Sequence, residues 1–329
     1  DLHSFPTRRS SDLEPGLEYQ GDLAVRGVDR LVFGGKIDRQ TARATDDDAK
    51  FGFQPRYDVE EVWRSAFALY SFNPTDVLNL TAALRADEFG PAGTEGTWRL
   101  SGSYRFPELG AKLRASYGTG AKAPTIQQRF ENSGFAIGNP DLGVETSRGF
   151  DIGLDQEFAG GAVTLSGTYF SSDIDDLIAT EFDPLSGKLT FVNVDSAAID
   201  GIELAASWKA ASWLTLRGAY THLDAVDADT GLKLPRRPDD AFNLRATVSP
   251  VDGLTLTASA TYVGERFSRS GERDLLDEYV RVDLGGTYAL APDVEVFFRA
   301  ENVLDAEYEE IKDFGTAGRS GYFGVRARF

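Results

Sequence analysis

The sequence has no cysteine, no methionine and only two histidines in 329 residues. The absence of cysteine excludes disulfides, thiolate metal sites and cysteine nucleophiles. No apolar run approaches the roughly 18 residues that a membrane helix needs, which excludes a helical membrane protein but leaves a membrane barrel open. The formal net charge of −18 argues against nucleic-acid binding, because a phosphate backbone requires a basic surface.

The beginning of the chain is unusual. There is no methionine at position 1 and no signal peptide, so we interpret the chain as a fragment whose start is missing. Residues 1–13 show neither a strand nor a helix period and resemble translated sequencing-adapter read-through, with a polar loop as the alternative. We therefore treat 1–13 as a non-native or disordered leader and expect residues 14–329 to form the folded part.

No catalytic, metal or cofactor site is predicted. His3 lies in the leader, and His222 stands alone where a strand enters a loop, a position at which histidine is usually solvated. No nucleophile elbow, histidine pair or phosphate-binding glycine loop occurs. Asp46, Asp47 and Asp48 offer oxygen ligands for Ca²⁺, but their spacing fits no calcium loop and favours a solvated acidic run. The chain is not expected to be an enzyme.

What the sequence does contain is period-2 alternation, in about fourteen segments beyond residue 13. Successive strand side chains point to opposite faces. The final run thus has an apolar face and a cationic face, formed respectively by Phe323, Val325, Ala327 and Phe329 and by Tyr322, Gly324, Arg326 and Arg328. In a membrane barrel the first face contacts lipid and the second faces a wet lumen.

The connections between these segments alternate in length. Short turns near 73–76, 107–110, 159–161, 210–212, 250–253 and 291–293 separate longer polar segments near 26–60, 89–95, 118–145, 172–187, 222–239, 265–277 and 304–317. Short turns at one rim and long loops at the other are typical of an outer-membrane barrel, with the C-terminus at the short-turn rim. A soluble β-protein is the alternative.

Tyrosines recur at the end of the apolar faces. They are Tyr104, Tyr117, Tyr169, Tyr220, Tyr262 and Tyr288. We interpret them as an aromatic girdle at one end of the strands, because a tyrosine ring suits the boundary between hydrocarbon and water. Cross-strand aromatic packing in a soluble sandwich is the alternative.

Two groups of motifs occur in order along the chain. The first comprises Asn139, Pro140, Asp141, Leu142 and Glu145, and the second comprises Asn302, Tyr308, Gly318 and Arg319. These motifs resemble those of TonB-dependent outer-membrane receptors, particularly the vitamin B12 (cobalamin) receptor branch. A third stretch, from Tyr117 to Pro124, is similar to the family's motif before a long external loop, but it has Ala121 where phenylalanine is usual. Gly143-Val144 likewise replace a commoner Lys-Pro pair. The terminal Phe329, with Phe323 and Val325, resembles the assembly signal of the family.

The resemblance implies an all-β, antiparallel transmembrane barrel of about 22 strands with an N-terminal plug. We expect this chain to supply about fourteen of those strands as an open sheet, without the plug, the TonB-binding segment or the first eight or so strands. It further implies the outer membrane of a Gram-negative bacterium and TonB-driven import of a scarce, bulky nutrient. Cobalamin is the first candidate and a ferric siderophore the second, with a passive porin or structural barrel as the alternative of another class.

The expected partners follow from the same resemblance. They are outer-membrane lipid, the TonB complex through the missing N-terminal part, the cobalamin or siderophore ligand, and the outer-membrane insertion machinery. Ligand-binding residues are unknown from the sequence.

Overall fold

The computed structural model describes residues 15–44 and 57–328, apart from the side chains at 194 and 195. The leader 1–13, the acidic run Asp46 to Asp48 and the terminal Phe329 lie outside the described residues. Residue contacts divide the chain into two compact units, each described here by itself. The first comprises Asp1–Gly102, Ser116–Phe150 and Ser172–Ala197, and the second comprises Ser103–Ala115, Asp151–Ser171 and Ala198–Phe329.

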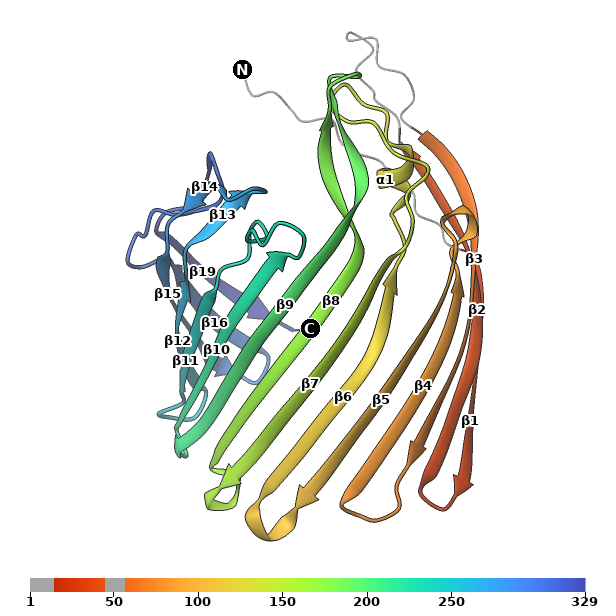
Figure 1. Cartoon of the computed structure of the whole chain (residues 1–329). Coiled ribbons are helices and arrows are strands. Elements are labelled where there is room, and N and C mark those ends of the chain that lie inside the picture. The colour runs from red at the N-terminus through yellow and green to blue at the C-terminus, as the bar shows by residue number, and fades with distance from the viewer. Residues whose placement is uncertain (1–14, 45–56, 329) are drawn as a thin grey trace. The chain divides into compact units, whose positions relative to one another are not determined.

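Fifteen strands form one antiparallel sheet, in which every strand lies beside its neighbours in the chain (Figure 1). They are β1 (Gly16–Arg26), β2 (Asp29–Ala44), β3 (Tyr57–Phe72), β4 (Leu78–Glu88), β5 (Thr94–Phe106), β6 (Ala111–Lys122), β7 (Glu145–Phe158), β8 (Val163–Asp183), β9 (Lys188–Ala211), β10 (Leu214–Asp227), β11 (Asp240–Val248), β12 (Leu254–Val263), β15 (Tyr279–Ala291), β16 (Val294–Glu301) and β19 (Ser320–Ala327). Two ribbons, β13 (Arg266–Arg269) with β14 (Arg273–Leu276) and β17 (Glu309–Ile311) with β18 (Phe314–Gly315), lie in connections.

The predicted fold class is confirmed. The strand order begins at β1 and ends at β19, and no pairing joins these two strands within the described ranges, so the sheet is open as expected. Among the described residues, helical structure is limited to α1 (Ile126–Phe130) and three single 3₁₀ turns, at Gly90–Ala92, Pro107–Leu109 and Ala159–Gly161. Across the described residues, no helix has the length and apolar character needed to cross a membrane.

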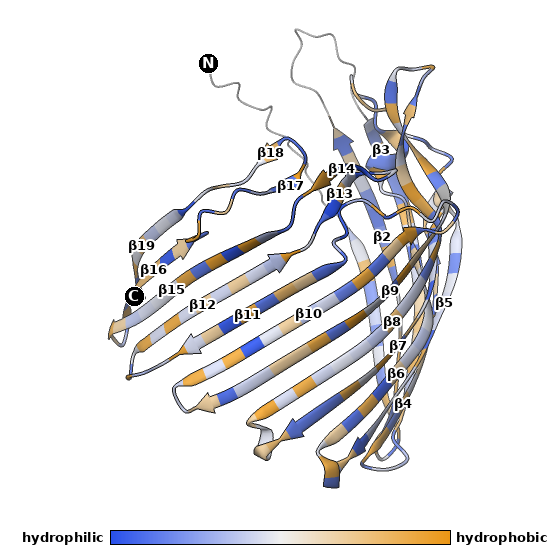
Figure 2. Cartoon of the chain, turned by 60° about the vertical axis from the view of Figure 1, so that its left-hand side comes forward, coloured by the Kyte–Doolittle hydropathy of each residue, from blue (hydrophilic) through white to orange (hydrophobic). Residues whose placement is uncertain are grey.

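In the second unit the strand register keeps the two faces of the sheet apart. Leu256 pairs with Gly286 and Ala260 with Val282, whereas Thr261 pairs with Arg281 on the other face. Figure 2 shows the resulting alternation of apolar and polar residues along β10, β11, β12 and β15. A hollow of about 650 Å³ is lined mainly by polar-face side chains, among them Arg245, Thr257, Ser259, Asp283, Arg299 and Arg326. The hollow of this unit therefore lies on the polar face of the sheet, and the apolar face is turned away from it.

Phenylalanine rings cover glycines on neighbouring strands. Gly21 pairs with Phe33 and Gly34 with Phe67 in the first unit, and the second unit repeats the arrangement with Gly286 and Phe298 and with Gly324 and Phe297. A Cβ at Gly324 would lie 2.5 Å from the ring of Phe297, and one at Gly286 would overlap the ring of Phe298. Glycine is thus needed at these positions because the ring fills the space that a side chain would take.

Apart from 89–93 and 184–187, which are as short as the turns, the connections alternate in length as predicted, and this alternation defines a turn rim and a loop rim. The turn rim carries 27–28, 73–77, 107–110, 159–162, 212–213, 249–253 and 292–293, and the loop rim carries, among the described residues, 89–93, 123–144, 184–187, 228–239, 264–278 and 302–319. Two predicted loops are wrong in extent. The segment 26–60 contains a tight turn at Gly27 and the whole of β2, and most of 172–187 belongs to β8.

The tyrosines do not mark one end of the sheet. Because antiparallel strands reverse direction, tyrosines at the C-terminal ends of successive strands alternate between the rims. Tyr117, Tyr169, Tyr220 and Tyr262 belong to strands that run to the loop rim, with Tyr262 next to its end, whereas Tyr104 and Tyr288 lie near the turn-rim ends of strands that run the other way. The tyrosines therefore form two tiers, one on the strands that run to each rim, and the predicted single girdle is wrong.

Candidate functional site

The loop 123–144 of the first unit is built around the short helix α1. Thr125 caps it: its hydroxyl accepts a hydrogen bond from the backbone N–H of Gln128, and the Gln128 side chain accepts one from the Thr125 backbone N–H. This reciprocal capping satisfies backbone donors that a helix N-terminus leaves free. The helix is anchored by Arg129, whose guanidinium forms an ion pair with Glu61 of β3 at 2.5 Å. Both side chains are almost fully buried, so losing either partner would leave an uncompensated charge.

The predicted motif at Asn139 fastens this loop to β9. The Asn139 side-chain amide donates to the carbonyl of Phe191 at 2.9 Å, and its side-chain oxygen accepts from the backbone N–H of Asp141 at 3.0 Å. The second contact is an Asx turn, which fixes the direction of the chain through Pro140. Leu142 is buried directly after it, with 2% of its surface exposed.

Glu145, the last residue of the first motif, joins three strands. Its carboxylate accepts from the ammonium group of Lys122 at 2.8 Å and from the backbone N–H of Ile178 at 2.9 Å. Asn193 acts beside it: its side chain accepts from the N–H of Gly143 at 2.9 Å and donates to the carbonyl of Asp176 at 2.7 Å. Leu142 and Glu145 are buried and position the loop, whereas Pro140 and Asp141 are exposed at its surface.

The second motif does the same for the loop 302–319 of the second unit. Asn302 is 2% exposed and adopts a left-handed backbone conformation, with φ +50°. Its side chain accepts from the N–H of Ala306 at 2.8 Å and donates to the carbonyl oxygens of Ala306 at 2.9 Å and Ala317 at 3.4 Å. Its own backbone N–H donates to Asp283 on β15 at 2.9 Å. One asparagine thus holds both ends of the loop.

The other residues of this motif also help to hold the two ends of the loop 302–319 together. Asp305 accepts from the backbone N–H of Arg319 at 2.9 Å, and a Cβ at Gly318 would lie 3.1 Å from that carboxylate. The ring of Tyr308 stacks on Tyr279 with centroids 4.0 Å apart, and its hydroxyl accepts from Arg281 at 3.4 Å. The structure therefore brings Asn302, Gly318 and Arg319 together, with Tyr308 closing the loop against β15.

A hollow of about 580 Å³ lies between this loop and β14. Its charged lining is Asp277, Asp305, Glu307 and Glu309 with Lys312, and the apolar Leu276 and the ring of Tyr308 complete it. Lys312 pairs with Glu309 at 3.3 Å and Asp305 with Arg319 at 3.8 Å. Two carboxylates, those of Asp277 and Glu307, are left without an ion pair among the described residues, so the hollow favours neutral hydrogen-bond donors or cations over anions.

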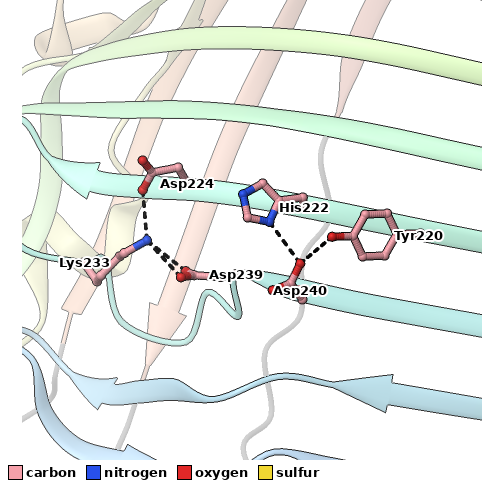
Figure 3. A network of polar contacts seen from close by, with 6 residues as sticks. All are labelled: Tyr220, His222, Asp224, Lys233, Asp239 and Asp240. Carbon is pink, nitrogen blue, oxygen red and sulfur yellow. Dashed lines mark hydrogen bonds and ion pairs between the residues drawn. The ribbon is translucent and has the colours of Figure 1, made fainter.

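His222 is not merely solvated. Its Nδ1 lies 3.0 Å from the carboxylate of Asp240, which also accepts from the hydroxyl of Tyr220 at 2.6 Å (Figure 3). Beside them the ammonium group of Lys233 contacts Asp224 and Asp239, each at 3.0 Å. Burial alone would lower the pKa of Lys233, but the hydrogen bonds to these carboxylates outweigh it and raise the pKa. The arrangement ties the loop 228–239 to β10, and nothing in it presents a nucleophile.

Sequence reasoning missed the residues that hold these loops from outside the motifs, namely Glu61, Arg129, Asn193 and Arg266. Arg266 is buried, with its guanidinium donating to the carbonyl of Glu309 at 2.7 Å. A charged residue in a short polar segment carries no signal of burial. Only the pairing of a lone arginine in 123–144 with an acid on an apolar-patterned strand offered a clue.

Comparisons with known proteins agree with this architecture of strands and anchored loops. The family described as TonB dependent receptor-like, beta-barrel matches residues 3–303. The chain belongs to the TonB-dependent receptor family. Members of this family lie in the bacterial outer membrane and are transporters, so the predicted location is confirmed and the expectation that the chain is not an enzyme holds. The apolar face is accordingly the lipid-facing one and the polar face lines the lumen.

Two curated relatives are vitamin B12 transporters named BtuB. That of Photobacterium profundum is 30% identical over 278 residues, covering 83% of this chain and 44% of the relative. That of Vibrio vulnificus is 28% identical over 259 residues, covering 77% and 41%. The chain thus spans less than half the length of either relative.

Solved structures agree on the fold. A ferric enterobactin receptor (PfeA) from Pseudomonas aeruginosa has a TM-score of 0.77 at 20% identity, covering 97% of this chain and 54% of that one. The copper transporter OprC has a TM-score of 0.79 at 16% identity, covering 96% and 58%. At these identities the likeness establishes the fold alone.

Proposed function

We propose that the receptor carrying this chain imports cobalamin across the outer membrane, with energy from the TonB complex. The observation that carries the proposal is the 30% identity to a vitamin B12 transporter, which extends over 83% of the chain. The bracketed loops at the loop rim would supply part of the capture surface. Engagement of TonB and gating would depend on segments that correspond to the rest of the relatives' length.

The electrostatics of the loop rim support this ligand over a ferric siderophore. Cobalamin presents amide side chains, which donate hydrogen bonds to carboxylates, whereas a ferric catecholate complex is anionic. The hollow beside Tyr308 offers Asp277 and Glu307 without an ion pair in the described ranges. An anionic ligand would meet repulsion there that a neutral amide-rich ligand would not. The ferric siderophore remains the second candidate because siderophore receptors share the fold.

The test is a binding titration of the receptor in detergent with cyanocobalamin and with a panel of ferric catecholates. We expect saturable binding of cyanocobalamin and at least roughly tenfold weaker binding of the ferric complexes, the selectivity of about 1.4 kcal/mol that one charge repulsion supplies. Asp277→Asn with Glu307→Gln should narrow that gap by strengthening only the binding of ferric complexes. Tight binding of a ferric complex with none of cyanocobalamin would refute the proposal.

A further inference from the structure

Three consecutive connections of the second unit are hydrogen-bonded to one another at the loop rim. They are 228–239, 264–278 and 302–319, which we call the first, second and third rim loops. The second carries the ribbon β13–β14 and the third carries β17–β18, and the two ribbons contact each other through β14 and β17 (Figure 2). The conformation of each loop therefore depends on its neighbour as well as on the strands that it connects.

The contact between the second and third rim loops is buried. The guanidinium of Arg266 donates to the carbonyl of Glu309 at 2.7 Å, and the hydroxyl of Ser268 accepts from the backbone N–H of Lys312 at 3.0 Å. Arg266 is 6% exposed and Ser268 is 4% exposed. A buried polar group that loses its partner carries the full cost of its desolvation. Separating these two loops without opening both is therefore unfavourable.

The contact between the first and second rim loops holds strained backbone in place. The N–H of Arg236 donates to the carbonyl of Phe267 at 2.7 Å, and the N–H of Lys233 donates to the carboxylate of Glu272 at 3.1 Å. Arg236 and Glu272 both have a left-handed backbone, with φ +59° and +52°. A residue with a Cβ keeps this conformation only where the surrounding contacts fix it. The same two residues that carry the strain thus make the contact between the loops.

Strained backbone is concentrated in the three rim loops. Among the described residues, six of the eight non-glycine residues with a left-handed backbone lie there, namely Arg236, Glu272, Asp274, Asn302, Asp305 and Asp313. Loops that folded independently would each have to offset this strain with their own contacts. The hydrogen bonds between the loops offset part of it, so the loops stabilise one another.

We propose that the three rim loops form one cooperative unit that orders and opens as a whole. The unit shapes the hollow of about 580 Å³ described above, because Leu276 and Asp277 come from the second rim loop and Tyr308 and Glu309 from the third. Among the described residues the first rim loop contributes nothing to its lining, so that loop supports the hollow through the second. A hollow formed before its ligand arrives saves the cost of ordering loops on binding. The proposal is independent of which nutrient the receptor imports.

The test removes one contact between two rim loops and measures the third. Ser268→Ala deletes the bond to Lys312, and hydrogen exchange of the full-length receptor in detergent is followed by mass spectrometry. One buried hydrogen bond corresponds to exchange about tenfold faster, and we expect that factor in all three rim loops. The first rim loop is the decisive one: the amide of Leu234 donates to Ala225, and neither residue touches Ser268.

A second variant approaches the unit from the other side. Glu272→Ala deletes the acceptor of the Lys233 N–H, and because Glu272 is exposed we expect a smaller effect, about threefold. The effect should reach the third rim loop, where the amide of Arg319 reports on it through its bond to Asp305.

The matched control is Ser166→Ala, which removes a hydroxyl bond of 2.7 Å to Asp155 between β7 and β8 of the same unit. It should change exchange in the rim loops by less than twofold. The proposal is overturned if Ser268→Ala leaves Leu234 at the wild-type rate while the second and third rim loops accelerate. It is equally overturned if Glu272→Ala leaves Arg319 unchanged, or if the control accelerates all three loops as much as Ser268→Ala does.

Discussion

Replacing Asn302 tests whether the family motif holds the two ends of the loop 302–319 together. Asn302→Ala removes two good hydrogen bonds to Ala306, at 2.8 and 2.9 Å, and a weak one to Ala317 at 3.4 Å. Ala306 is only half-buried, so each good bond contributes about 1 kcal/mol. Alanine at φ +50° adds roughly 1 kcal/mol of backbone strain. The expected loss is about 3 kcal/mol of local stability.

Glycine separates the two contributions. Asn302→Gly removes the hydrogen bonds but adopts the left-handed conformation freely, so it should lose about 2 kcal/mol. Hydrogen exchange of the backbone amides in 303–319 reports local opening directly. With tenfold for every 1.4 kcal/mol, we expect exchange about a hundredfold faster in the alanine variant and about thirtyfold faster in the glycine variant.

The matched control is Asn243→Ala, which removes one exposed side-chain bond to Thr261, at 3.0 Å, from a residue with ordinary backbone geometry. It should change exchange in 303–319 by less than twofold. Equal exchange in the wild type and in the alanine and glycine variants would refute the claim that Asn302 stabilises the loop 302–319. If both Asn302 variants exchanged equally fast, and faster than the wild type, the left-handed backbone at residue 302 would contribute nothing to the effect of the alanine substitution.

Three further outcomes are expected. Gly286→Val should destabilise the folded receptor by about 1–3 kcal/mol in urea, because the new side chain overlaps a ring on the neighbouring strand, whereas Gly96→Val, with no atom within 4 Å of its Cβ, should not. Leu284→Arg on the lipid face should cost about 2–4 kcal/mol of stability in lipid vesicles, and Thr257→Arg on the lumen face close to nothing. We also propose that Phe329→Ala lowers insertion of the receptor more than stability of the inserted form; equal membrane levels of variant and wild type would contradict this.

Alternation predicted the strands well where lipid contacts one face and water the other. It failed where that contrast ends. The part of β8 beyond residue 171 has polar residues on both faces, such as Asp173 and Asp176, because a strand that extends beyond the bilayer has no lipid side to select apolar residues. The segment 29–44 was missed for a related reason: Gly34, Gly35 and several charges interrupt its alternation.

The motif residues were identified by resemblance, yet their role was not predictable from their spacing. Asn139 bonds to Phe191 and Glu145 to Ile178, partners in strands distant along the sequence. A side chain that satisfies backbone groups of another segment leaves no periodic signal. The buried pair of Arg129 and Glu61 likewise leaves no periodic signal, and only the lone arginine in 123–144 offered a clue to it.

The separation of the two tyrosine tiers also indicates the thickness of the bilayer that matches the protein. Tyr288 pairs with Leu254, and Tyr262 lies eight positions further along the same strand, so the tiers are separated by eight residues. At about 3.3 Å per residue and a tilt of 35–45°, this corresponds to roughly 20 Å along the membrane normal. A thicker bilayer would have to compress around the protein at a cost of fractions of a kcal/mol per ångström. Hydrophobic matching alone would thus retain this chain in the thin outer membrane and disfavour thicker membranes and long-chain lipids.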